Sequence, residues 1–152
     1  MVKEGTAAPV FKTTDANGET VNLKDFSGQK VVLYFYPKDD TPGCTKEACS
    51  FRDAFSKFKK QGITILGVSP DSEKSHQKFV TKYKLPFTLL ADTDHSIADA
   101  YGVYGEKKFM GRTYMGIHRT TFLIDEMGKI KKVFEKVKPE DHADEVLGAF
   151  SG

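Results

Sequence analysis

The sequence has little that favours a membrane, a nucleic acid or a disulfide-stabilised scaffold. Its 23 basic and 21 acidic side chains almost balance, and a formal charge of +2 gives no support for nucleic-acid or membrane binding through bulk electrostatics. The first residues do not lead into an apolar run, and the longest apolar stretch, near Val31, is too short to cross a bilayer. We therefore expect no signal peptide, no nucleic-acid or membrane partner, and a cytoplasmic location.

Cysteine is also scarce. Only two of the 152 residues are cysteines, Cys44 and Cys49. Structural disulfides are rare in the cytoplasm, so two thiols this close together point to redox chemistry or metal binding.

The domain organisation is simple, because the sequence contains no internal repeat, linker or low-complexity segment. Its length and its 39% of hydrophobic residues predict one globular domain over residues 1–152.

Alternating strands and helices in the middle of the chain predict an α/β fold. The continuous apolar run at 31–36 is typical of a strand covered on both faces, and Pro37 ends it. Further strands are expected at 63–68, 87–90, 120–124 and 129–137, and helices at 42–60, 72–85, 96–101 and 141–150. The segment 15–19, which contains Asn-Gly, predicts an N-terminal hairpin, whereas 105–116 is expected to be a basic, glycine-punctuated loop. Together these elements predict a thioredoxin-like arrangement, a central mixed sheet with helices on both faces.

The two cysteines lie at the predicted start of a helix. Thr41 suits the N-cap and Pro42 the first helical position, which places Cys44 in the first turn. Unpaired N–H groups and the helix dipole favour negative charge there, so the thiol is placed to ionise, and the thiolate is the nucleophile. The nearby Cys49 suggests that a product formed on the first thiol is resolved by the second.

Ionisation alone accounts for little of a fast reaction. Lowering the pKa of a thiol from about 8.5 to about 6 raises its thiolate fraction at neutral pH by only about tenfold or somewhat more, which is roughly 1.4–2 kcal/mol. Most of the acceleration must come from groups that stabilise the transition state. We therefore expect a cation and hydrogen-bond donors close to Cys44.

Four segments resemble one family. Residues 37–44 (PKDDTPGC) resemble the proline-x-x-x-threonine-x-x-cysteine signature of peroxiredoxins, and residues 45–49 (TKEAC) resemble the Q-type branch, also called bacterioferritin comigratory protein. Residues 5–11 resemble the N-terminal segment of the family, and residues 116–125 (GIHRTTFLID) resemble the strand that carries its active-site arginine. The resemblance spans nearly the whole chain in the expected order.

The resemblance implies a role for each matching residue. Cys44 resembles the peroxidatic cysteine, whose thiolate attacks a hydroperoxide to give a sulfenic acid and water or an alcohol. Thr41 would hold the peroxide oxygens, Pro37 would shield the pocket, and Arg119 would stabilise the thiolate and the charge that develops along S···O···O. Cys49 would then form an intrachain disulfide with Cys44, and a dithiol protein such as thioredoxin would reduce it. The implied enzyme is an atypical 2-Cys, thioredoxin-dependent peroxiredoxin, often a monomer, with no cofactor or metal.

The spacing of the cysteines adds a mechanistic hypothesis. In an intact helix, residues five apart have Cα atoms roughly 8–9 Å apart, beyond the limit of ~7 Å for a disulfide. The start of the helix must therefore unwind before the disulfide closes. Gly43 has two interpretations at this stage: it eases unwinding as a weak helix former, or it allows the backbone to approach the substrate closely.

Plainer alternatives remain for these features. Each cysteine is also compatible with simple packing, and Arg119 with a surface ion pair. A thiol–disulfide oxidoreductase is a second function class, although the cysteines lack C-x-x-C spacing. A metal-binding module ranks last, because the four scattered histidines do not have metal-site spacing with the cysteines. The loop at 105–116 has three interpretations: an ordinary flexible loop, a rim of the active site, or a docking surface for the reductant.

Overall fold

The structure, a computed structural model, describes residues 1–151. Its strands are β1 (Lys12–Asp15), β2 (Thr20–Asn22), β3 (Lys30–Phe35), β4 (Ile63–Ser69), β5 (Thr88–Ala91), β6 (Tyr104–Phe109), β7 (Arg112–Ile117), β8 (Thr120–Ile124) and β9 (Ile130–Glu135). Its helices are α1 (Pro42–Asp53), α2 (Phe55–Lys60), α3 (Glu73–Tyr83), α4 (Ser96–Tyr101) and α5 (His142–Ser151), with a 3-10 turn, η1, at Leu23–Phe26. No helix within residues 1–151 is long and apolar enough to cross a membrane.

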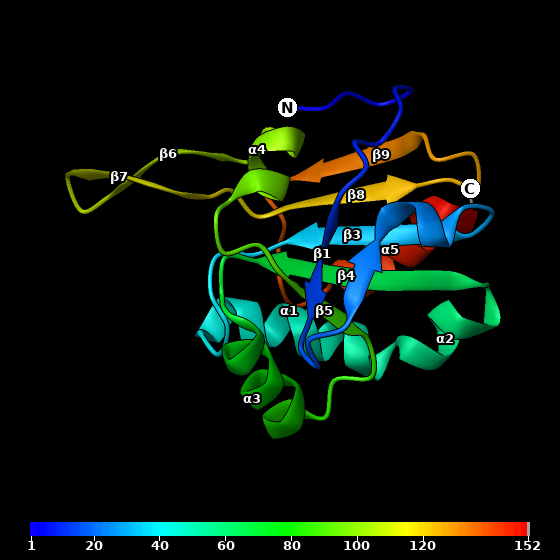
Figure 1. Cartoon of the computed structure of the whole chain (residues 1–152), viewed down its shortest axis with the longest axis horizontal. Helices are drawn as coiled ribbons and strands as arrows, with labels where there is room; N and C mark the ends of the chain where they lie inside the picture. Colours follow the sequence, from blue (N-terminus) through cyan, green and yellow to red (C-terminus); the bar gives the residue numbers. More distant parts are fainter. Residues whose placement is uncertain (152) are drawn as a thin grey trace.

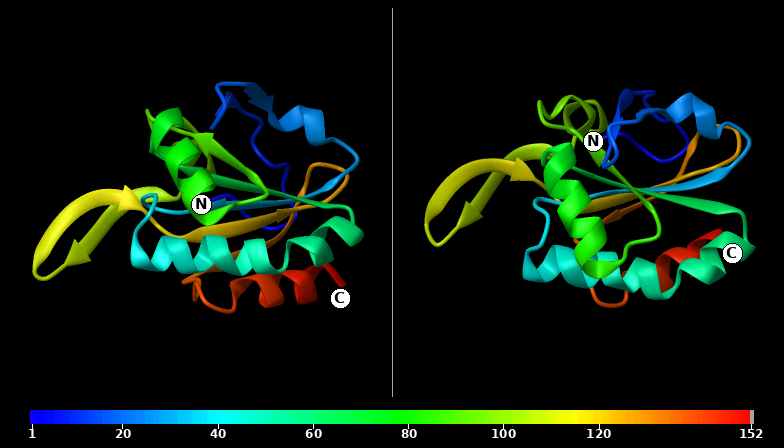
Figure 2. Two further views of the ribbon diagram at one scale, coloured as in Figure 1. Left: turned by 90° about the horizontal axis from the view of Figure 1, so that it is seen from below. Right: turned by 60° about the horizontal axis from the view of Figure 1, so that its bottom comes forward.

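Seven strands form one mixed sheet in the order β2-β1-β5-β4-β3-β8-β9. The central strands β3, β4 and β5 are parallel, whereas β8, β9 and the N-terminal hairpin β1–β2 pair antiparallel. Helices lie on both faces of this sheet (Figure 1), and α1 and α5 run side by side on one face (Figure 2). The predicted thioredoxin-like α/β fold with its N-terminal hairpin is confirmed.

The hydrophobic core has two parts, one on each face of the sheet. Alternate residues of β3 point to opposite faces: Val32 and Tyr34 join the cluster under α1, α2, α3 and α5, whereas Val31 and Leu33 join the cluster under α4 and η1. All four of these side chains are buried. This burial on both faces explains why the strand is continuously apolar rather than alternating.

The predicted helix at 42–60 is wrong in one respect, because it is broken at Ala54. That residue has φ −96° and ψ 3°, so α1 ends at Asp53 and α2 begins at Phe55. The break still leaves Phe51 and Phe58 fully buried on one face, with ring centroids 5.7 Å apart. The apolar spacing remained regular across the break, and neither glycine nor proline marks it.

The predicted loop at 105–116 is also wrong, because this segment forms a β-hairpin. β6 and β7 pair over six residue pairs, from Tyr104 opposite Ile117 to Phe109 opposite Arg112. The two-residue turn has positive φ at both Met110 and Gly111, at 52° and 78°, as primed hairpin turns require. Beyond the root, where Ile117 is buried and Tyr104 packs against the core, the strands lack apolar alternation because the core does not cover them.

The register of the central sheet sets the place of the site. Phe35, the last residue of β3, lies opposite Thr120, the first residue of β8. The antiparallel pairing therefore brings Arg119 to the end of β3, where the chain turns toward the start of α1. Two segments about 75 residues apart in sequence meet at this point.

Candidate active site

Cys44 lies in the first turn of α1, as predicted. Thr41 occupies the N-cap position with extended backbone angles, and its carbonyl accepts the first helical hydrogen bond from the Thr45 amide at 2.8 Å. The Thr41 hydroxyl does not cap the helix; it donates instead to the carbonyl of Lys38 at 3.0 Å. The N–H groups of the first turn, which lack intrahelical acceptors in any helix, therefore receive no side-chain cap from Thr41 and are available to an anion. The Cys44 thiol itself is almost completely enclosed, at 2% exposure.

Arg119 joins Cys44 to a buried carboxylate. Its Nη2 donates to Cys44 Sγ at 3.2 Å, and its Nη1 donates to Glu47 Oε1 at 2.6 Å. Burial alone lowers the pKa of Arg119, but Glu47 and Cys44 together raise it above its ordinary value. The guanidinium is therefore a fixed positive charge held in contact with the sulfur. The expected cation near Cys44 is present, and the surface ion pair considered for Arg119 is wrong, because its Glu47 partner is completely buried.

Glu47 is a site residue that the sequence interpretation missed. Its side chain has no exposure, and its Oε2 has no hydrogen-bond partner in the described part of the chain. Burial raises the pKa of Glu47 to about 7, although Arg119 acts in the opposite direction. A signal did exist: Glu47 shares a helix face with Cys44, Ala48 and Phe51, all buried, so it is a charged residue within an apolar stripe.

The structure gives a reason for glycine at position 43 that neither interpretation of the sequence included. A Cβ atom at this position would lie 3.2 Å from Arg119 Nη2 and 3.9 Å from Pro139 Cγ. The absence of a side chain therefore lets the guanidinium lie against the first turn of α1. Gly43 provides the space through which Arg119 reaches Cys44.

The loop that carries Pro37 is held by a buried hydrogen-bond network centred on Asp39. Its Oδ1 accepts from the Tyr36 hydroxyl at 2.6 Å, and its Oδ2 accepts from Ser75 Oγ at 2.8 Å and contacts His76 Nδ1 at 2.7 Å. Ser75 and His76 belong to α3, so the network fixes the loop to that helix. Pro37 itself is half-buried.

Cys49 lies one and a half turns further along the same helix and is half-buried. Both cysteines are free thiols, and α1 is continuous between them. α1 is also held along this stretch by the C-terminal segment, because Lys46 pairs with Glu140 at 3.3 Å and Ser50 Oγ accepts from the Ala143 amide at 3.3 Å. The structure thus brings Cys44 and Arg119 into contact, whereas the intact helix α1 keeps Cys49 apart from Cys44.

A metal centre receives no support from the geometry. Within residues 1–151, one group of three ligand-type side chains, Asp39, Asp71 and His76, has its ligand atoms within 4.8 Å of one another. These atoms are already engaged in hydrogen bonds, including one from the Asp39 amide to Asp71 Oδ2 at 2.8 Å. Neither cysteine belongs to the group. Within residues 1–151 the geometry therefore offers the metal-binding module no ligand set that uses the thiols.

A nearly enclosed thiol at a helix N-terminus, in contact with an arginine on a thioredoxin-like sheet, defines a class of protein: the thiol-dependent peroxidases. A single reactive sulfur flanked by a fixed cation suits nucleophilic attack on an O–O bond. A dithiol exchanger has no use for such a cation.

The comparisons with known proteins agree with this class. The AhpC/TSA family matches residues 5–133. A putative peroxiredoxin bcp of Coxiella burnetii is 54% identical over 147 residues, 97% of this chain and 97% of that protein. Peroxiredoxin Bcp of Escherichia coli K12 is 51% identical over 146 residues, 96% of this chain and 94% of that protein. A solved structure of Xanthomonas campestris bacterioferritin comigratory protein, described in terms of alkyl peroxide reduction, has a TM-score of 0.91 and 37% identity, with 98% of each chain covered. The chain belongs to the AhpC/TSA family and is a peroxiredoxin.

Proposed function

We propose that Cys44 is the peroxidatic residue of a thiol peroxidase that reduces hydrogen peroxide and organic hydroperoxides. The thiolate attacks one peroxide oxygen and the O–O bond breaks. The sulfur gains that oxygen as a sulfenic acid, and the other oxygen leaves with its electron pair and takes a proton to become water or an alcohol. The single observation that carries the proposal is the 3.2 Å contact between Arg119 Nη2 and Cys44 Sγ. Alkyl peroxide reduction by the Xanthomonas campestris relative supports the substrate class.

Arg119 acts in this proposal on the charge that develops during attack. Negative charge moves from sulfur to the leaving oxygen, and a cation that already touches the sulfur also lies close to the line S···O···O. Glu47 fixes the guanidinium from its other side at 2.6 Å, so little reorganisation is required when charge moves. Glu47 is a positioning residue, because it acts through Arg119 rather than on the substrate.

Thr41 and Pro37 shape the peroxide site in this proposal. Because the Thr41 hydroxyl donates its proton to the carbonyl of Lys38, its lone pairs remain available to accept a hydrogen bond from the O–H of a hydroperoxide. That orientation directs the substrate toward Cys44 three residues later. Pro37 shields the other side of the loop from water.

Cys49 resolves the sulfenic acid in this proposal. Its thiol attacks the oxidised sulfur of Cys44, a disulfide forms within the chain, and the sulfenic oxygen leaves as water. Closure requires the first turns of α1 to unwind, because an intact helix holds the two Cα atoms roughly 8–9 Å apart. Unwinding must also break the contacts of Lys46 with Glu140 and of Ser50 with Ala143.

The reductant in this proposal is a dithiol protein of the thioredoxin type, which exchanges its thiols with the Cys44–Cys49 disulfide. The enzyme acts as a monomer built from one thioredoxin-like domain over residues 1–152. It works in the cytoplasm, where dithiol reductants keep thiols reduced.

The test is rapid mixing of pre-reduced protein with hydrogen peroxide, followed by turnover with thioredoxin, thioredoxin reductase and NADPH. We expect fast peroxide consumption that Cys44→Ser abolishes. Cys49→Ser should react once and then stall or over-oxidise. Mass mapping of the oxidised parent should show Cys44 joined to Cys49 in one chain. Slow peroxide loss that Cys44→Ser leaves unchanged would contradict the peroxidase, and normal thioredoxin-supported turnover of Cys49→Ser would contradict its resolving role.

A further inference from the structure

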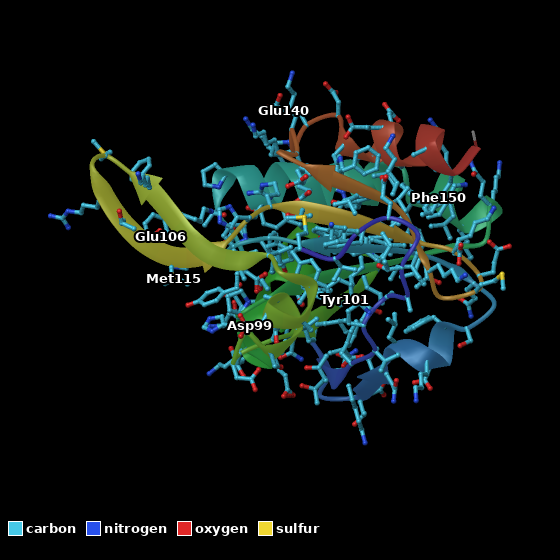
Figure 3. All side chains as sticks on the ribbon, turned by 90° about the horizontal axis from the view of Figure 1, so that it is seen from above. Asp99, Tyr101, Glu106, Met115, Glu140 and Phe150 are labelled. Carbon is cyan, nitrogen blue, oxygen red and sulfur yellow. The ribbon has the colours of Figure 1, made fainter. Side chains whose placement is uncertain are left out.

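The hairpin β6–β7, residues 104–117, extends away from the body of the protein; we call it the arm. It forms a separate two-stranded sheet, outside the seven-stranded sheet. Figures 1 and 2 show it projecting from one end of the molecule, and in Figure 3 the labelled Glu106 and Met115 lie along it, well away from Tyr101 in the core. An isolated two-stranded hairpin gains little stability in water by itself. A role in binding would explain why the chain forms one outside the main sheet.

The arm concentrates the exposed apolar surface of the protein. Seven large hydrophobic side chains are exposed in the described part of the chain, and four of them belong to the arm: Phe109, Met110, Tyr114 and Met115. Met110 at the turn is 86% exposed and Phe109 beside it is 66% exposed. Single exposed hydrophobic residues are ordinary, but a cluster on a projecting element is typical of an interaction surface. Aromatic residues and methionine are also enriched at protein interfaces.

The arm is positively charged as well as apolar. It carries Lys107, Lys108 and Arg112 against a single acidic residue, Glu106. A second copy of this chain is a poor occupant for it, because two arms laid together would bring Lys108 and Arg112 of each copy close to those of the other. A partner with an acidic surface around apolar side chains complements the arm in both respects.

The root of the arm lies close to the site. Lys107 Nζ donates to the Ile117 carbonyl at 2.8 Å, and His118 Nε2 donates to the Glu106 carbonyl at 3.1 Å. Burial, together with the charge of Arg119, lowers the pKa of Lys107, while the Cys44 sulfur acts in the opposite direction. Arg119 follows the end of β7 by only two residues. A partner that contacts the root of the arm therefore lies near Arg119 and the Cys44 sulfur.

We propose that the arm is the docking surface for the dithiol protein that reduces the oxidised enzyme, and that this reductant presents acidic and apolar side chains around its own dithiol. The inference rests on the proposed function, which requires such a reductant. Transient redox encounters bury less than about 1,200 Å² in total, an area that a hairpin and the adjacent rim of the site can supply. The electron pair passes by thiol–disulfide exchange: the reductant becomes a disulfide, and Cys44 and Cys49 return to thiols.

The experiment compares two arm variants with two matched controls. Phe109→Ser/Met110→Asn removes apolar surface from the tip, and asparagine tolerates the positive φ of the turn. Its control, Val10→Ser/Met127→Asn, removes two comparably exposed side chains, at 59% and 82%, elsewhere on the surface. Lys108→Glu/Arg112→Glu reverses charge on the arm, and Lys57→Glu/Lys60→Glu does the same on exposed positions of α2.

Three measurements separate docking from chemistry. The first is the single-turnover reaction of pre-reduced protein with hydrogen peroxide, the second is turnover with dithiothreitol, and the third is turnover against increasing thioredoxin. We expect the first two rates of both arm variants to stay within about twofold of the parent, because the altered side chains are exposed. The kcat/KM for thioredoxin should fall at least about tenfold in both arm variants and in neither control. The defect of the charge variant should shrink as salt rises, because exposed charges are screened.

The outcomes distinguish this inference from the proposed function. A parent protein that fails to react with peroxide in the single-turnover assay refutes the proposed function, and the docking inference falls with it. Normal peroxide reaction with unchanged thioredoxin kinetics in the arm variants overturns the docking inference alone. An equal defect with dithiothreitol also overturns it, because the arm then acts on the chemistry. A concentration-dependent dimer that the arm variants abolish, detected by light scattering, assigns the arm to a second copy instead.

Discussion

Arg119→Met removes the guanidinium that contacts both Cys44 Sγ and Glu47 Oε1, at 3.2 and 2.6 Å. Methionine fills part of the volume of the arginine stem without supplying a charge or a donor. The first turn of α1 keeps its own hydrogen bonds, so the thiol stays in place. The variant therefore isolates the contribution of the cation to the reaction of the thiol with peroxide.

The expected loss has two parts of different size. Any contribution of Arg119 through the thiolate fraction is limited to about 10–30-fold, the ratio between a partly and a fully ionised thiol near neutral pH. Removal of a preorganised donor that stabilises transition-state charge costs about 10²–10³ in rate, or about 3–4 kcal/mol. We therefore expect the second-order rate constant with hydrogen peroxide to fall by about 10³–10⁴ near neutral pH.

Glu47 provides the control for this variant. Without Arg119 its buried carboxyl group loses the only partner of Oε1 that the structure shows and the cation that lowers its pKa, and any fraction that still ionises is an unpaired buried charge. Glu47→Gln and the double variant Arg119→Met/Glu47→Gln remove that charge. If the cation acts directly on the reacting atoms, the double variant should be as slow as Arg119→Met. Recovery of the rate in the double variant would show instead that a stray carboxylate caused the loss.

The assay is stopped-flow peroxide reduction by pre-reduced protein at two pH values. Near pH 10 an ordinary thiol is largely ionised, so only the transition-state contribution remains. We expect a loss of about 10²–10³ to persist there. A loss of about 30-fold or less near neutral pH that disappears near pH 10 would refute the reasoning, because ionisation would then explain the whole effect.

Three further predictions follow from the site. Burial raises the pKa of Glu47 to about 7, so its contribution to the free energy of unfolding is complete below the unfolded value near 4.5 and is lost as pH rises through 7. Between about pH 4 and pH 8, urea unfolding should therefore show the parent losing about 3 kcal/mol more stability than Glu47→Gln. Equal pH dependence of the two proteins would contradict this. Gly43→Ala should slow the peroxide reaction in stopped flow, because the new Cβ presses on Arg119 Nη2 at 3.2 Å, despite a gain in helix propensity of up to about 1 kcal/mol; an unchanged rate would argue against that packing role. Peroxide oxidation should lower amide-exchange protection over residues 44–51, and unchanged protection in protein shown to carry the disulfide would refute helix opening.

Most of the fold was predictable because each strand or helix leaves a pattern in the residues that form it. The run at 31–36 is apolar because both faces of β3 are covered, and Thr41-Pro42 marks a helix start because an N-cap and a first-turn proline suit the chain there. Ser72 and Gly102 likewise mark helix ends. The arm escaped prediction because, beyond Tyr104 and Ile117 at its root, its residues do not belong to either core cluster and carry no apolar period. The break at Ala54 escaped because no glycine or proline marks it.

By itself, the sequence determined which chemistry the chain carries. Two thiols, one of them at a helix start, indicate a thiolate nucleophile whose reaction needs a nearby cation. The family resemblance indicated Arg119 as that cation. Only the tertiary structure decided how that chemistry is assembled. The pairing of β3 with β8 brings Arg119 to Cys44 across 75 positions of sequence, and the packing of α1 buries Glu47 behind the guanidinium. Burial and long-range register depend on the whole chain at once, whereas residue type and helix start depend only on neighbours.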